Sequence, residues 1–249
     1  MHILRTLAAS ALVLVTLLVK AEVVARYAPL ETSKYRQAAA AFESVGLLEQ
    51  ISQSLNAKVR LPGRVGLVAK ECGTANAYYD QASRSVYLCY ELMEQVMTGV
   101  SRDFPNLKPA ENVEVSGGAL LFILNHEIGH ALIHVLSLPI LSREEDQADA
   151  IATYLQLKGK NPAPGLKGAF WFFRRGDQWY TNRHFGDEHS LGPQRQYNIL
   201  CLAVGSDPQK FAAWARELGL PDERARRCQQ EYSTLDASVR KLLGRHVVQ

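Results

Sequence analysis

The chain has 249 residues, of which 47% are hydrophobic and 21% charged, with a formal net charge of +3. This composition is ordinary for a globular protein with one sizeable core or two small lobes. So mild a positive charge says nothing about nucleic acid, but no basic run with interleaved aromatics occurs, and we expect no nucleic-acid binding.

The N-terminus has the pattern of a secretory signal peptide. Basic residues precede an uncharged run over residues 7–19, and small residues around Lys20 fit a cleavage site after Ala21. The run is shorter than the roughly 20 apolar residues that span a bilayer. We therefore expect residues 1–21 to be removed and the protein to be secreted or periplasmic. The alternative is an uncleaved membrane anchor, because residues 23–25 extend the apolar character past Lys20.

The rest of the chain, residues 31–249, is expected to form one domain, with a helical C-terminal subregion from about residue 166. Apolar spacing and breaker residues predict these elements: a helix over 31–57, a strand over 59–69, a hairpin over 75–88, a helix over 91–100, a loop over 101–115, helices over 116–135 and 142–157, and short helices after Pro193. Strands that precede helices, without alternating with them, predict an α+β fold with a small antiparallel sheet.

The four cysteines fit an oxidising compartment. Cys72 and Cys89 bracket the expected hairpin, and their midpoint falls at its turn, so a bridge across the hairpin is natural. Cys201 and Cys228 lie in the helical C-terminal region and would pair with each other. Free buried thiols or a second metal site are the alternatives, but no C-x-x-C spacing supports a metal.

The sequence HEIGH over residues 126–130 is the most informative motif. His126 and His130 are four residues apart in a helical pattern, so both imidazoles point the same way and can bind one zinc ion. Glu127 can then act as the base that deprotonates the attacking water. The alternative is an ordinary core helix whose polar side chains have other partners.

Catalytic zinc needs a third protein ligand. His134 is too far along the helix axis to share one ion with His126, and Leu136 stands where a metzincin has histidine. Glu145, on the next predicted helix, is favoured as the ligand, with Asp149 one turn later to accept the free N–H of a ligating histidine. Glu144 could be the ligand in its place. Alternatively, Glu145 binds no metal and only caps the N-terminus of its helix, because Ser142 to Glu145 has the pattern of a capping box.

The polar loop before Cys201 contains candidates for stabilising the oxyanion of a hydrolytic transition state. His189 is the first choice as this catalytic group, followed by Arg195 and Tyr197. An ordinary solvated loop is an equally good interpretation.

HEIGHALIH followed by E-x-x-A-D resembles the gluzincin metallopeptidases, whose third zinc ligand is glutamate. The chain resembles more closely a bacterial family of zinc metallopeptidases described as a domain of unknown function. Further stretches carry this resemblance: 71–77, 88–92, 138–149 and 194–201. It implies a zincin-like fold and Zn²⁺ held by His126, His130 and Glu145, without defining a substrate.

These features predict a zinc metallopeptidase that hydrolyses peptide bonds, with Glu127 as the general base and residues 85–89 as the sheet edge that receives an extended peptide. Its partner would be a peptide or protein substrate, with membrane contact only through an uncleaved N-terminal segment. Two alternatives stay open: a non-catalytic, zinc-stabilised envelope protein that binds a protein partner, and a zinc amidase that acts on a cell-wall amide.

Overall fold

A computed structural model describes residues 22–174 and 180–248, so the predicted signal peptide lies outside the described residues. The strands are β1 (Val23–Tyr27), β2 (Val65–Lys70), β3 (Ala77–Asp80) and β4 (Ser85–Cys89). The helices are α1 (Arg36–Val45), α2 (Leu47–Lys58), α3 (Tyr90–Asp103), α4 (Pro109–Val135), α5 (Glu144–Leu157), α6 (Ala163–Arg174), α7 (Asn182–Phe185), α8 (Gly192–Ser206), α9 (Pro208–Glu217) and α10 (Asp222–Leu243), followed by a 3-10 turn, η1 (Gly244–His246).

The four strands form one mixed sheet in the order β1-β2-β4-β3. β1 and β2 are parallel and are connected through α1 and α2, as a parallel pair requires. β2 and β4 are also parallel, whereas β3 and β4 form the expected antiparallel hairpin. β2 is buried along almost its whole length, which suits an inner strand of continuous apolar sequence.

The α+β class is confirmed, but the prediction of an antiparallel sheet is wrong for two of these three strand pairings. The predicted strand over 59–69 begins only at Val65, because Pro62 and Gly63 interrupt it; Val59 makes a single bridge to Val247. β4 is not the sheet edge that we expected, since it lies between β2 and β3. β3 is the sheet edge that lies beside α4.

Two predicted helix boundaries are also wrong. The helix expected over 31–57 is two helices, since Gly46 adopts a left-handed conformation (φ 63°) that ends α1 and begins α2. The loop expected over 101–115 is short, because α4 begins at Pro109 and not at Ser116. Proline is favourable at the first helical position, and the Glu111 carboxylate accepts the backbone N–H of Lys108 at 2.8 Å.

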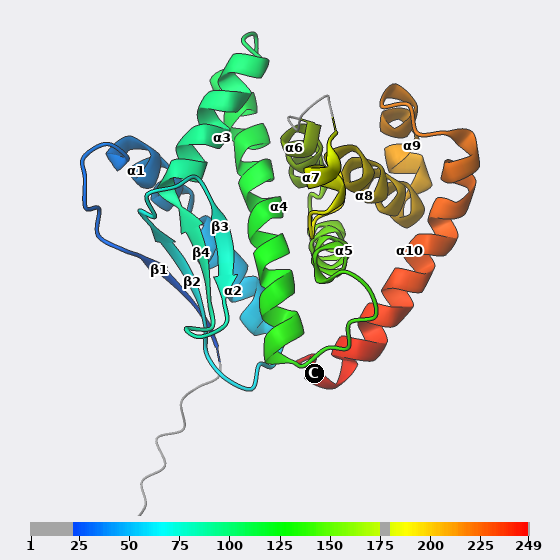
Figure 1. The fold of residues 1–249 in the computed structure, drawn as a ribbon, viewed down its shortest axis with the longest axis horizontal. Coiled ribbons are helices and arrows are strands. Elements are labelled where there is room, and N and C mark those ends of the chain that lie inside the picture. Colours follow the sequence, from blue (N-terminus) through cyan, green and yellow to red (C-terminus); the bar gives the residue numbers. More distant parts are fainter. Residues whose placement is uncertain (1–21, 175–179, 249) are drawn as a thin grey trace, which may run out of the picture.

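Helix α4 is the centre of the molecule. In Figure 1 the sheet lies on one side of it, and α5, α6 and α8 lie on the other. By length and composition α4 is apolar enough to cross a membrane. However, 72% of the most apolar stretch of α4 is buried inside the protein, so its apolar residues form part of the core.

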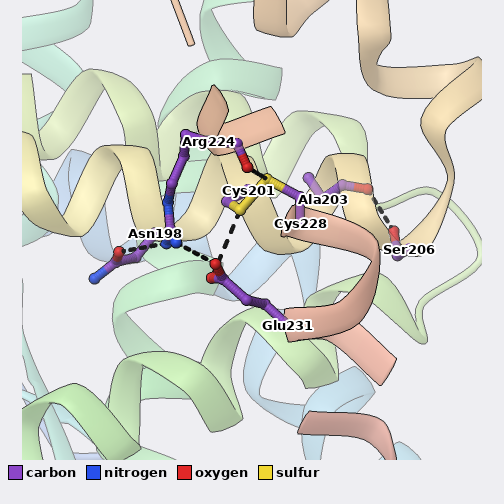
Figure 2. The surroundings of a disulfide bond; sticks show 7 residues. All are labelled: Asn198, Cys201, Ala203, Ser206, Arg224, Cys228 and Glu231. Carbon is purple, nitrogen blue, oxygen red and sulfur yellow. Dashed lines mark hydrogen bonds and ion pairs between the residues drawn. A yellow bond between two sulfur atoms is a disulfide. The ribbon is translucent and has the colours of Figure 1, made fainter. Parts of the chain in front are cut away.

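The second half of the chain consists of helices that pack against α4, and the last of them, α10, packs on α8 and α5. Both expected disulfides are present, Cys72–Cys89 across the hairpin and Cys201–Cys228 between α8 and α10. Figure 2 shows that Arg224 on α10 also contacts α8, because its guanidinium donates to the Asn198 side chain. The same guanidinium pairs with Glu231 on its own helix. α8 is therefore fixed by covalent and polar contacts.

Glycines allow α4 and α6 to cross closely. A Cβ added to Gly118 would lie 2.2 Å from the carbonyl oxygen of Pro164, and one added to Gly168 would lie 2.2 Å from the backbone nitrogen of Ala119. Neither contact can be relieved by turning a side chain, because both partners are backbone. Gly117, by contrast, has open space around it.

We predict that Gly118→Ala lowers the free energy of unfolding by roughly 1–3 kcal/mol, because the added methyl forces α4 and α6 apart. Gly117→Ala is the matched control and should raise that free energy by up to about 1 kcal/mol, as alanine favours helix. Denaturant unfolding of both variants measures the difference. Equal effects at the two positions would contradict the close crossing.

Candidate metal centre

The predicted ligands converge at the packing of α4 against α5. His126 and His130 are one turn apart on α4, and their Nε2 atoms lie 3.2 Å apart. The Glu145 carboxylate, in the first turn of α5, lies 3.0 Å from Nε2 of His126 and 3.4 Å from Nε2 of His130. The structure therefore brings together three groups from two helices, with eight residues of chain (136–143) between the end of α4 and the start of α5.

This convergence depends on the small residues where α4 and α5 touch. A Cβ on Gly129 would lie 3.0 Å from both Cα and the carbonyl oxygen of Ala148. Ala148 is itself fully buried. Because neither residue has a larger side chain, the helices approach closely enough for Glu145 to reach both imidazoles.

The spacing of the three groups fits a tetrahedral metal ion. Ligand atoms about 2.0–2.1 Å from zinc in a tetrahedron are about 3.3–3.4 Å from each other. The Nδ1 atom of His126 lies 2.8 Å from Asp149, and that of His130 lies 2.8 Å from Glu144. If each Nδ1–H donates to its carboxylate, both Nε2 lone pairs face Glu145. Three electron-rich groups that face one another are a favourable place for a cation.

The electrostatics of the cluster also favour a cation. Burial opposes a charge on His130, but hydrogen bonds to Glu145 and Glu144 outweigh it and raise its pKa to about 9. Burial likewise opposes the charge of Glu145, yet contacts with the histidines hold its pKa well below the usual range. In this negative site, the histidines take up protons when no metal ion competes for them.

Asp149 is held in turn by Arg195 from α8. The guanidinium donates through Nε and Nη2 to the two carboxylate oxygens, both at 2.7 Å, and stacks on the Phe173 ring at 3.9 Å. Burial would raise the pKa of Asp149, but hydrogen bonds from His126 and Arg195 lower it. Arg195 therefore positions Asp149 and, through it, His126, and it also lines the cavity beside Glu127.

Glu127 lies beside the three groups and is buried. Burial raises its pKa above the usual value for a glutamate; the neighbouring His126 and His130 partly offset this, and a hydrogen bond from the backbone of Tyr79 on β3 adds a smaller opposing effect. A cavity of about 180 Å³ adjoins it. The lining combines site residues with an apolar wall that includes Leu92, Phe122, Ile123, Phe172 and Phe173. Glu127 thus stands between the predicted metal ligands and an apolar cavity.

His189 is at the rim of the same site, with its side chain 40% exposed. Its Nε2 lies 3.0 Å from Glu145, and its Nδ1 lies 2.9 Å from Asp187. One ligand atom each from His126, Glu145 and His189 lie within 4.8 Å of one another. His189 therefore faces the point on which the predicted ligands converge, and its role stays a prediction.

Other sequence candidates are elsewhere or have other contacts. The capping interpretation of Glu145 is wrong, because Arg143 is the N-cap of α5 and makes no side-chain cap bond. His134 contacts the Tyr79 hydroxyl at 2.8 Å. Tyr197 donates to the Leu218 carbonyl, outside the cluster.

Sequence reasoning missed two parts of the site. Glu144 was considered only as a substitute ligand, but it accepts from His130 while its neighbour Glu145 faces both imidazoles. Its place directly before Glu145 could have indicated this second carboxylate–histidine pair. The apolar cavity wall was also missed, and the aromatic run Phe170–Phe173 was the available signal.

The chain belongs to a family that is described as "Putative metallopeptidase" (DUF4344), whose model matches residues 27–243. The match confirms the family that the motifs resemble. No curated protein and no solved structure gives a significant match. The family description implies a metal and a peptide substrate, and it names neither the ion nor a particular peptide.

We predict that Glu145→Ala weakens zinc binding by orders of magnitude, because only His126 and His130 remain. Glu144→Ala and Asp149→Asn should each weaken it only about 10–100-fold, since they remove groups that orient the histidines. Competitive chelator titration of the purified proteins separates these outcomes.

Gln147→Ala is the control, because this residue is on the same turn of α5 and its side chain contacts Pro139. It should bind zinc as the parent does. If Glu145→Ala also binds zinc as the parent does, the third ligand has been misassigned.

Proposed function

We propose that this member of the metallopeptidase family is a zinc-dependent peptidase that works outside the cytoplasm. One observation carries the proposal: two imidazoles and one carboxylate converge within 3.0–3.4 Å, with a buried glutamate beside them. A structural zinc site is usually closed by four protein ligands and needs no base. Glu127 therefore favours a catalytic site.

Zinc is the ion that suits this set of ligands best. Imidazole nitrogens suit zinc, copper, iron and nickel, and two histidines with one glutamate are a known catalytic zinc set. When bound, zinc would supply the Lewis acidity that hydrolysis of an amide at neutral pH needs. Asp149 and Glu144 fix the tautomer of each histidine so that Nε2 is free to bind.

Glu127 would move the protons of the reaction. Burial raises its pKa, which makes its carboxylate a better base than an exposed glutamate. It would accept a proton from the attacking water and then donate it to the leaving amine. The Nε2 of His189, at the rim, would donate to the oxyanion as charge develops on the carbonyl oxygen.

The structure offers a place for an extended peptide along β3. β3 is the edge strand of the sheet on the side of β4, and the backbone of its Tyr79 contacts Glu127. A peptide that adds to this edge would bring its backbone past Glu127. An apolar side chain next to the cleaved bond would then enter the cavity that Phe122 and Phe173 line.

Secretion is supported by two independent features. The N-terminal sequence has the pattern of a cleavable signal peptide that ends at Ala21. The two disulfides suit an oxidising compartment such as the periplasm or the extracellular space.

We predict that Glu127→Gln keeps the fold and the zinc content but lowers peptide hydrolysis by about 10²–10⁴-fold, because it removes a base and not a ligand. Turnover is measured on a proteome-derived peptide library and is divided by the zinc content of each preparation.

Glu114→Gln is the control, since it makes the same change at an exposed position of the same helix. It should cleave as the parent does. Turnover of Glu127→Gln at the level of this control would place the catalytic base elsewhere.

A further inference from the structure

One end of the molecule gathers several segments that are distant in the sequence. β1, β2 and β4 are parallel, so all three strands begin at the same end of the sheet. The hairpin turn before β4 is there too, and Arg60 donates its backbone N–H to His246 at 2.6 Å. Figure 1 places the start of β1, the loop between α4 and α5, and the C-terminus along this same end.

The loop between α4 and α5 presents apolar side chains at this end. Leu141 is 98% exposed and Ile140 is 38% exposed. Leu138, just before them, is buried in the core and fixes the base of the loop. Leu141 contributes little to the packing of the described chain, because its side chain is almost wholly exposed.

Exposed arginines lie on the segments that meet at this end of the molecule. Four of them, together with Ile140 and Leu141, define what we call the basal face: Arg60, Arg84, Arg143 and Arg245. None of these four has an acidic partner within 4 Å among the described residues. A fifth cation, Arg64, pairs with Glu22 at 3.7 Å. The basal face therefore combines exposed positive charge with an exposed apolar loop.

We propose that the basal face docks on an anionic lipid bilayer. Ile140 and Leu141 would insert among the headgroups, and the arginines of the basal face would lie against lipid phosphates. Membrane surfaces bind proteins that combine exposed apolar side chains with basic residues, because binding strength comes from buried apolar area together with attraction to anionic lipids. The inference concerns a surface, so it stands whether or not the metal centre hydrolyses peptides.

The test uses indole fluorescence of the full chain with vesicles of brominated phosphatidylcholine and phosphatidylglycerol. Leu141→Trp adds an indole at the tip of the loop, and the three native tryptophans are measured in the parent as background. We expect quenching to remove roughly half or more of the added emission, because bromine quenches only indoles that enter the lipid. The matched control is Val113→Trp, at a 57% exposed apolar position near the start of α4; its emission should not change.

Charge reversal tests the contribution of the arginines of the basal face. Arg60→Glu with Arg245→Glu, made in the Leu141→Trp protein, should abolish most of the quenching, whereas Lys210→Glu with Arg216→Glu on α9 should not. Equal quenching at positions 141 and 113, or no quenching at 141, would overturn the proposal. So would a concentration-dependent blue shift of the Leu141→Trp emission without vesicles, since a second copy of the chain would then cover this face.

Discussion

The close approach of α4 and α5 at Gly129 and Ala148 is the contact on which the rest of the site depends. Glu145 reaches Nε2 of both histidines only because no side chain larger than a methyl group separates the two helices. The histidine pair is set by the local geometry of one helix, but the third group comes from another. A shift of α5 by an ångström or two would leave the imidazoles without their carboxylate.

Outside the converging groups, a series of contacts holds them in orientation. Each imidazole has its own carboxylate, Asp149 or Glu144, and Arg195 fixes Asp149 with two hydrogen bonds. Arg195 belongs to α8, which the Cys201–Cys228 bridge ties to α10. The C-terminal helices thus support the candidate metal centre through the contact of Arg195 with Asp149.

The parts that sequence could predict are those that local spacing determines. The histidine pair follows from helical periodicity, and the hairpin bridge follows from a turn midway between Cys72 and Cys89. The order of the strands could not be predicted, because β1, β2 and β4 pair in parallel across long connections that leave no local signal. The start of α4 was missed because Pro109 was interpreted as a loop residue, although proline is favourable in the first turn.

The most direct test of the account is anomalous diffraction at the zinc edge from crystals of the protein grown with zinc. We expect one strong peak, about 2.0–2.2 Å from Nε2 of His126, Nε2 of His130 and a carboxylate oxygen of Glu145. Glu127 should lie near this peak without binding the ion. A peak bound by other residues, or no peak between α4 and α5, would contradict the central claim that these two helices build a single metal centre.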